Sequence, residues 1–221
     1  MDIKKKYMSS RLDRLDKDGR NLLAKREIYT AEYLLEKFYD LDLKKYNSVV
    51  DYGCGDKFLE NEILKRGKSY RGFDINDFDF NEDKPPLKDN SIDFVISLAV
   101  IEHLRHPEKL LSESYRILKP GGCIYLTTPN WQFDSKNFYN DYTHITPFTP
   151  KSLEMILIDS GFLNVSTYPG LRCKHKWFYQ GKSRFHKAFF LFPFLGTNKF
   201  VPEFLKGHAR SIIAIGLKEN K

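Results

Sequence analysis

The sequence predicts a doubly wound α/β fold, with a mostly parallel sheet of seven strands covered on both faces, and three observations support this prediction. Short apolar runs alternate along the chain with stretches of helical spacing. Two glycines, Gly53 and Gly55, separate the first apolar run from the helical pattern after it. The second apolar run ends at an acid, Asp74. Ligands of such folds bind at the carboxyl ends of the strands, so we expect the functional site there.

The first half of the chain begins with a charged helical segment over residues 1–46, and the main domain is expected to span 47–221. A strand over 48–52 comes first, and the glycine turn then opens a helix over 58–67. A second strand is predicted over 69–75. The stretch 76–90 is too short and polar for a normal helix and strand, so this crossover is predicted to be abbreviated.

The second half continues the alternation. A long apolar run predicts a strand over 92–100, followed by a helix over 107–122 that stops at a Pro-Gly-Gly signal. A strand over 123–129 comes next. Thr149 and Pro150 begin a helix over 149–162, with Gly161 at its end. The last two strands are predicted over 163–169 and 209–218, and residues 171–209 form an insertion before the last strand.

Composition indicates a single reduced domain. The chain has 221 residues, and its three cysteines lie far apart without a C-x-x-C pair, as is typical of cytosolic proteins. The first ten residues lack the apolar stretch of a signal peptide, and no apolar run approaches the roughly 20 residues of a membrane span. We therefore expect a cytoplasmic protein.

The net charge of +7 is unevenly distributed. Between Leu171 and Arg210 the chain has nine Lys or Arg and one acid, whereas the remainder has 27 basic and 28 acidic residues. Ten aromatic residues share this basic segment. It could be an ordinary cap with a small core of its own, a substrate-facing element that contacts an anionic membrane surface, or a nucleic-acid surface. Nucleic acid is the least favoured of these partners.

The glycine turn favours a ligand that carries a ribose but no phosphate. A dinucleotide fingerprint would need a third glycine where Phe58 stands, and the P-loop pattern is absent. Asp74, at the tip of the second strand, is placed to accept both ribose hydroxyls. Asp51, beside the turn, would favour a positively charged ligand. S-adenosylmethionine (SAM) has a sulfonium, an ammonium group and no phosphate.

Several ordered blocks resemble the class I SAM-dependent methyltransferases, in particular the type 11 and type 23 families. These blocks are VVDYGCG, GFDI, IEHL, LKPGG and the segment DYTHITPFTPKSLEMILIDSGF. The resemblance runs from Val49 to about Gly161, about half of the chain. It implies a Rossmann-like methyltransferase fold with SAM as cofactor, and cofactor contacts from Asp51, Tyr52, Gly53, Cys54, Gly55, Asp74, Ile75, Asp79, Ser97, Leu98, Ala99 and His103.

Alternatives stay open for some of these residues. Tyr52 and Cys54 are expected to contact SAM through the backbone only, and core packing is an equal alternative for Ser97, Leu98 and Ala99. The family commonly has a glycine where Lys57 stands. Its segment after the second motif is also longer, so that Asp79 and Asn81 are both candidates for the contact to adenine.

No metal is predicted from the sequence. In one metal-assisted branch of the superfamily, the region of Glu102 and His103 supplies metal ligands. One acid and one histidine without a third clear ligand give little support for a metal, and a structural hydrogen-bonding role for His103 is favoured.

The predicted catalytic residues are His144 and Asp141, on the loop that follows the strand over 123–129. A histidine with a pKa near neutral can remove the proton of an acceptor hydroxyl, and an acid three residues earlier can orient it. The alternative is that both residues only stabilise the loop.

The resemblance implies methylation of oxygen. Residues 141–154 resemble bacterial enzymes that methylate sugars of surface polysaccharides, so a sugar or glycan acceptor is expected, including a lipid-linked glycan. The alternatives are a small aromatic or lipid-soluble acceptor and, from another class, a non-catalytic protein of the same fold that binds nucleic acid. Peripheral contact with the inner membrane face through residues 171–209 is a further expectation.

Overall fold

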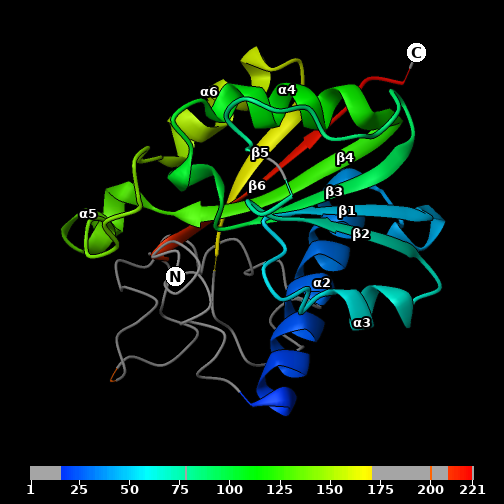
Figure 1. Ribbon diagram of the computed structural model, residues 1–221, viewed down its shortest axis with the longest axis horizontal. Helices are drawn as coiled ribbons and strands as arrows, with labels where there is room; N and C mark the ends of the chain where they lie inside the picture. The colour runs from blue at the N-terminus through cyan, green and yellow to red at the C-terminus, as the bar shows by residue number, and fades with distance from the viewer. Residues whose placement is uncertain (1–15, 78, 171–199, 201–208, 221) are drawn as a thin grey trace.

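A single sheet organises the part of the chain that the computed structural model describes, residues 16–77, 79–170, 200 and 209–220 (Figure 1). Its strands lie in the order β2-β1-β3-β4-β6-β5. Their bounds are Ser48–Tyr52 for β1, Ser69–Phe73 for β2, Ile92–Leu98 for β3, Leu118–Pro129 for β4, Leu163–Pro169 for β5 and Ser211–Leu217 for β6. Only β6 among the described strands runs opposite to the others. The predicted mostly parallel sheet is thus confirmed, with six described strands instead of seven.

Consecutive residues of the central strands pack on opposite faces of the sheet. In β1, Val49 belongs to one buried cluster and Val50 to the other. The same alternation separates Cys123 from Ile124 in β4 and Ile213 from Ala214 in β6. Both faces are therefore apolar, as a sheet with helices on both sides requires.

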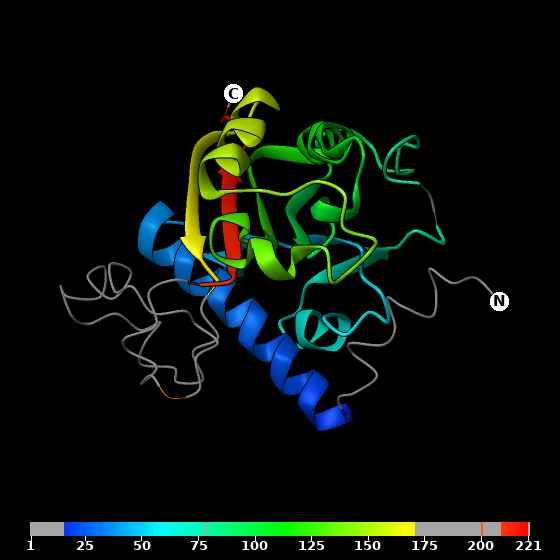
Figure 2. The same ribbon diagram turned by 90° about the vertical axis from the view of Figure 1, so that its left-hand side faces the viewer.

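Helices cover the two faces (Figure 2). On one side lie α2, the short α3 and the 3₁₀ turn η1, and on the other lie α4 and α6. A second 3₁₀ turn, η2, follows β3, and α5 follows β4. The bounds are Lys17–Tyr39 for α2, Leu43–Lys45 for η1, Glu60–Leu64 for α3, Ile101–His103 for η2, Pro107–Ile117 for α4, Trp131–Phe138 for α5 and Pro150–Asp159 for α6. The doubly wound arrangement follows from this placement.

The described part of the N-terminal segment 1–46 packs directly on the sheet. Asp16 caps the start of α2, because its side chain accepts a hydrogen bond from the Gly19 backbone N–H at 2.7 Å. Its apolar residues, among them Ile28 and Leu35, share a buried cluster with Phe94 and Tyr125 of the sheet. Residues 1–15 and most of the basic segment 171–209 lie outside the described residues.

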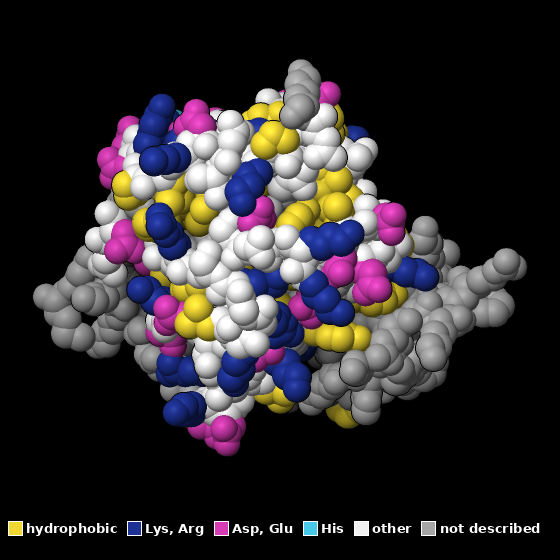
Figure 3. Space-filling model, turned by 90° about the vertical axis from the view of Figure 1, so that its right-hand side faces the viewer, with side chains coloured by type: hydrophobic (Ala, Val, Ile, Leu, Met, Phe, Trp, Pro, Cys, Tyr) yellow, Lys and Arg dark blue, Asp and Glu magenta, His cyan; other side chains and the backbone are white. Residues whose placement is uncertain are grey.

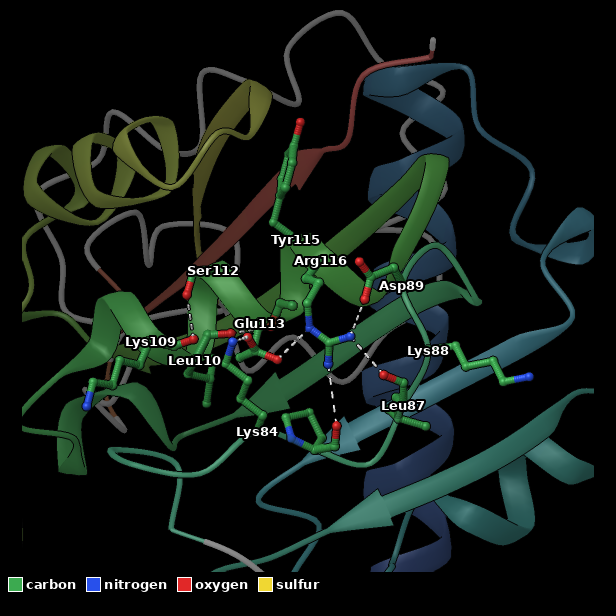
Figure 4. Close-up of polar contacts among 12 residues, drawn as sticks. Lys84, Leu87, Lys88, Asp89, Lys109, Leu110, Ser112, Glu113, Tyr115 and Arg116 are labelled. Carbon is green, nitrogen blue, oxygen red and sulfur yellow. Dashed lines mark hydrogen bonds and ion pairs between the residues drawn. The ribbon is translucent and has the colours of Figure 1, made fainter.

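The crossover from β2 to β3 contains neither helix nor strand in its described residues, as the sequence predicts, so the sheet ends at β2. Arg116 of α4 holds this crossover in place (Figure 4). Its guanidinium donates hydrogen bonds to the carbonyl of Leu87 at 2.8 Å and to the carboxylate of Asp89 at 2.5 Å, and it also binds Glu113 at 2.7 Å. Side-chain contacts replace the usual packing of a crossover helix.

Two elements differ from prediction. Helix α4 ends at Ile117, and the LKPGG stretch already belongs to β4 instead of closing the helix. Gly122 is needed there, because a Cβ atom on it would lie 2.9 Å from the carbonyl oxygens of Asp93 and Lys119. Helix α5 was not predicted. Asn130 caps its start, because the Asn130 side chain accepts a hydrogen bond from the Gln132 N–H at 3.1 Å.

The surface at the amino ends of the strands is not the predicted site. A cavity of about 310 Å³ opens there, lined by residues that include Ser48, Ser69 and Ile92, each the first residue of its strand.

Figure 3 shows a face on which Lys and Arg side chains are interspersed with Asp and Glu. None of the described helices is long and apolar enough to cross a membrane.

Candidate functional site

The turn after β1 contains two glycines whose surroundings differ. The backbone N–H groups of Gly53 and Cys54 donate to the carbonyl of Phe73 at 2.7 and 3.1 Å, which ties the turn to the end of β2. Gly53 has φ +73°, and a Cβ atom there would lie 2.1 Å from Val100 Cγ2. Gly55 has φ +54°, and a Cβ atom there would meet no atom within 4 Å. The first glycine permits close packing, and the second faces open space that a ligand can enter.

Asp74 lies at this opening. One of its carboxylate oxygens accepts from the Gly55 N–H at 2.6 Å, and the other accepts from the Ile75 N–H at 2.7 Å. The structure therefore brings the predicted acid and the predicted glycine turn into direct contact. A carboxylate offers about four lone-pair directions, so Asp74 keeps acceptor capacity for ligand hydroxyls.

Asp51 is buried beneath the turn. Its carboxylate accepts a hydrogen bond from the Tyr70 hydroxyl at 2.8 Å. Burial raises the pKa of Asp51 to about 7, although the Tyr70 hydrogen bond opposes the rise and the charge of Asp74 adds to it. A positively charged ligand nearby would favour its ionised form.

Tyr52 and Cys54 direct their side chains into the core. Tyr52 packs edge-on against Phe80, with ring centroids 5.6 Å apart. Cys54 lies against Gly72, where a Cβ atom would come within 2.7 Å of its sulfur. Burial raises the pKa of the Cys54 thiol to about 12, so the thiol stays neutral. Only the backbone of these two residues is placed to face a ligand at the turn.

The end of β3 borders the same edge of the sheet. Ser97 pairs with Tyr52, and the described residues offer its buried hydroxyl oxygen no hydrogen-bond partner. Leu98 is half-buried against the core, whereas Ala99 is exposed with φ +56°. An unpartnered buried hydroxyl at the edge of the opening is what a site for a polar ligand would contain.

The remaining predicted contacts lie on the loop after β2. Ile75 is an exposed apolar residue next to Asp74, a position suited to the face of a flat ring. Asp79 is also exposed, and its carboxylate accepts from the backbone and side-chain N–H groups of Asn81 at 2.9 Å. The Asn81 side-chain oxygen accepts in turn from the Arg105 N–H at 2.8 Å. Asp79 and Asn81 are thus linked to each other and to the segment after η2.

Taken together, these residues fit SAM. Two carboxyl groups suit its positive charges and ribose hydroxyls, the opening at Gly55 admits close backbone contact, and Ile75 offers an apolar surface. Lys57, the departure from the family pattern, is exposed and has φ +59°, a conformation that favours glycine. This explains why the family places glycine at that position.

The loop 139–149 folds over η2. The carbonyl of Glu102 accepts from the N–H groups of Ile145 and Thr146 at 2.8 and 3.0 Å. These bonds bring His144 against His103, with ring centroids 4.7 Å apart. Glu102, His103 and His144 each offer one ligand atom, and the three atoms lie within 4.8 Å of one another.

His144 and Asp141 are close, as predicted. The His144 Nδ1 atom donates to the carbonyl of Phe138 at 2.7 Å, and its Nε2 atom lies 3.6 Å from the Asp141 carboxylate. Asp141 also accepts from the backbone N–H and the hydroxyl of Thr143 at 3.0 and 2.6 Å. Burial opposes its ionisation, but these hydrogen bonds and the neighbouring imidazoles of His144 and His103 lower the pKa of Asp141 below its ordinary value.

Sequence analysis named Glu102 only as an adjacent partner of His103 in a metal-ligand pattern, and it missed Thr143, Tyr139 and Tyr142. Glu102 is buried, with an exposed fraction of 1%, and its carboxylate accepts from the Thr128 hydroxyl at 3.0 Å. The Thr143 hydroxyl connects Asp141 to His103 Nδ1, which lies 2.9 Å away. Tyr139 and Tyr142 expose aromatic rings on the same loop. No local pattern indicates these contacts, since they depend on a loop that returns over a turn some 40 residues earlier.

Comparison with known proteins identifies the family. A family model described as "Methyltransferase domain", of type 23, matches residues 13–167. A "Probable S-adenosylmethionine-dependent methyltransferase" of Mycolicibacterium smegmatis is 30% identical over 97 residues, which are 37% of this chain and 38% of that protein. The mitochondrial ubiquinone biosynthesis O-methyltransferase of Mus musculus is 28% identical over 159 residues, which are 56% of this chain and 43% of that protein.

The fold is shared with solved structures. A SAM-dependent methyltransferase from Archaeoglobus fulgidus superposes with a TM-score of 0.59 at 22% identity, over 87% of this chain and 94% of that one. The curated mycobacterial relatives match over only 30–38% of their own length. Because the family model covers most of the chain and the fold agrees, the protein belongs to the class I SAM-dependent methyltransferases, in the methyltransferase domain family of type 23.

Proposed function

We propose that this protein transfers the methyl group of SAM to a hydroxyl oxygen of an acceptor that binds beside the loop 139–149. One observation carries the proposal: Asp141, His144 and His103 form a cluster, and His103 belongs to the turn η2, which directly follows a residue packed against the glycine turn. Val100 packs against the glycine turn, and η2 with His103 follows it directly. An acceptor bound at this cluster would therefore face the donor at the end of β3.

The proposed reaction is an in-line displacement. The acceptor oxygen forms a bond to the methyl carbon while the bond between that carbon and the sulfonium sulfur breaks, and S-adenosylhomocysteine leaves. The acceptor proton passes to His144. Because SAM carries an activated methyl group, positioning of the two reactants can supply much of the rate.

A sugar or glycan is the first candidate acceptor. The exposed rings of Tyr139 and Tyr142 stand on the loop that carries Asp141 and His144. Aromatic rings pair an apolar face with a polar hydroxyl, and carboxylates accept hydrogen bonds from hydroxyl groups. A sugar ring presents both kinds of surface, so this combination suits it.

A small aromatic or lipid-soluble acceptor is the second candidate. The same two tyrosines would contact an aromatic ring, and the similarity to a protein named for O-methylation in ubiquinone biosynthesis favours this class. The two candidates share the oxygen nucleophile and differ in what surrounds it.

The test is methyl transfer from isotopically labelled SAM to two panels of acceptors, oligosaccharides with free hydroxyls and hydroxylated aromatic compounds. We expect labelled product with one panel, together with S-adenosylhomocysteine. His144→Ala should lower turnover by about 100-fold and leave SAM affinity nearly unchanged. His106→Ala, which removes an exposed histidine outside the cluster, is the matched control. Transfer to neither panel, or RNA binding without SAM binding, would contradict the proposal.

A further inference from the structure

We infer that Glu102, His103 and His144 form a binding site for a divalent transition-metal ion. The three residues supply a carboxylate and two imidazoles, one ligand atom each, within 4.8 Å of one another. Two histidines and one carboxylate are a ligand set that binds Zn²⁺ and Fe²⁺ in proteins, whereas Mg²⁺ and Ca²⁺ prefer oxygen ligands alone. Glu102 and His103 are adjacent in the sequence, and the loop 139–149 brings the third ligand beside them.

The hydrogen bonds around both imidazoles support this assignment. Nδ1 of His144 contacts the carbonyl of Phe138 at 2.7 Å, and a carbonyl can only accept, so Nδ1 carries the proton. The lone pair of the neutral ring then lies on Nε2. Metal-binding histidines characteristically donate their other nitrogen to a backbone carbonyl in this way.

The same reasoning applies to His103. The single hydroxyl proton of Thr143 is directed to Asp141 at 2.6 Å, so the hydroxyl oxygen accepts from His103 Nδ1 at 2.9 Å. This again leaves the lone pair of the neutral imidazole on Nε2. Asp141, Thr143 and His103 thus form a chain of carboxylate, hydroxyl and imidazole that holds the ring in one orientation.

The carboxylate is held as firmly as the two rings. Glu102 has an exposed fraction of 1%, and its side chain is fixed by the Thr128 hydroxyl at 3.0 Å. Its own backbone carbonyl anchors the loop that carries His144. Each of the three ligands therefore has a supporting partner, as metal sites require.

The role of the ion rests on the proposed function. With three protein ligands, the ion keeps a position open for the acceptor oxygen, whose proton it makes easier to remove. When the ion is bound, His144 is a ligand and no longer the base of the metal-free reaction, so the acceptor proton passes to solvent water.

The binding test uses the metal alone. EDTA-treated protein is titrated with Zn²⁺ by calorimetry, and with Co²⁺ followed by its visible absorption, without SAM or acceptor. We expect one equivalent to bind, about 100-fold weaker binding for His144→Ala and Glu102→Gln, and about tenfold weaker binding for Thr143→Val. His106→Ala, which alters an exposed His–Glu pair 3.3 Å apart, should bind normally. Circular dichroism shows whether each variant is folded.

Two results would overturn the site: no saturable binding to the unaltered protein, or undiminished binding in folded His144→Ala. The role of the ion in the reaction is tested separately. Methyl transfer at full rate by EDTA-treated protein would show that the reaction does not need the ion, and the proposed function would still hold. Metal binding at these residues without transfer to any acceptor would leave the site established and contradict the proposed function.

Discussion

At the scale of single residues, backbone conformation decides where a ligand can approach. Gly53, Gly55 and Gly67 all have positive φ angles, of 73°, 54° and 73°. Only at Gly53 would a Cβ atom collide with its surroundings. Gly55 and Gly67 therefore form a matched pair: both tolerate a methyl group sterically, and only Gly55 lies at the proposed cofactor edge.

Replacing either glycine of this pair by alanine should lower the free energy of unfolding by about 1 kcal/mol, because the left-handed conformation is strained for alanine. Gly55→Ala should also weaken SAM binding by at least about tenfold, since its methyl group occupies the opening, whereas Gly67→Ala should bind SAM normally. Calorimetric titration with SAM and denaturant unfolding measure the two effects. Equal SAM affinity in both variants would show that the ligand does not approach the turn.

The buried carboxyl of Asp51 should make SAM binding depend on pH. Its pKa is about 7 against an ordinary 3.8, so near pH 6–7 the Asp51 carboxyl of the ligand-free protein is largely protonated. Binding of a cationic ligand would release this proton. SAM affinity should therefore rise from pH 6 to pH 8, with proton release measurable by calorimetry in buffers of different ionisation enthalpy. Asp51→Asn should abolish the release. If the unaltered protein binds SAM without releasing a proton, the carboxyl does not sense the ligand.

Asp51 should also make the free energy of unfolding depend on pH, in the direction opposite to its effect on SAM affinity. Between pH 4 and pH 7 the unfolded chain has lost this proton while the folded protein keeps it, so the contribution of Asp51 to stability falls as pH rises through this window. Asp51→Asn should remove this fall. Comparing the pH dependence of unfolding in the two proteins isolates the contribution from that of other acids.

At the scale of elements, the crossover 76–90 shows how side chains replace a missing helix. Arg116 binds two backbone carbonyls and the Asp89 carboxylate of this crossover, and it also binds Glu113 on its own helix. The crossover also carries Asp79 and Asn81, the residues linked to the segment after η2. The contacts of Arg116 therefore connect α4 to the crossover that borders one side of the proposed cofactor site.

Arg116→Met should lower the free energy of unfolding by about 2 kcal/mol, because several charge-assisted hydrogen bonds are lost and Glu113 loses its partner. Amide hydrogen exchange should speed up in residues 87–89. Lys109→Met is the control, since it breaks an exposed ion pair with Glu82, 3.1 Å long, and such pairs contribute at most about 1 kcal/mol. Similar losses in the two variants would mean that the crossover is held by its own residues.

The sequence predicted most elements, because apolar runs mark buried strands whatever they pack against. The described strands lie within a few residues of their predicted positions, except that β4 starts at Leu118 instead of 123. That strand passes through Pro120 and two glycines. These residues predict the end of a helix, because they favour turns and the apolar run before them is short. The contact of Gly55 with Asp74 was predictable from strand order. The approach of His144 to Glu102 was not, since it depends on hydrogen bonds that close a loop over η2.

At the scale of the whole molecule, charge is separated along the chain. The segment from Leu171 to Arg210 has nine basic residues and one acid, and the rest of the chain is nearly neutral. It also contains ten aromatic residues, a composition typical of segments that bind anionic bilayer surfaces. In the chain it connects β5, an edge strand of the sheet, to β6.

We therefore expect the protein to sediment with vesicles that contain anionic lipid and to remain in solution with neutral vesicles. Replacing Arg172, Lys174, Lys176, Lys182 and Lys187 by glutamine should weaken this binding by more than tenfold, because each basic residue near an anionic surface contributes about 1 kcal/mol. The control variant replaces five lysines in residues 4–65 by glutamine, so that it loses the same positive charge from another part of the chain. Raising the salt concentration should weaken binding of the unaltered protein too, since screening shortens the reach of these charges. If the control variant loses as much binding as the segment variant, the attraction belongs to net charge and not to this segment.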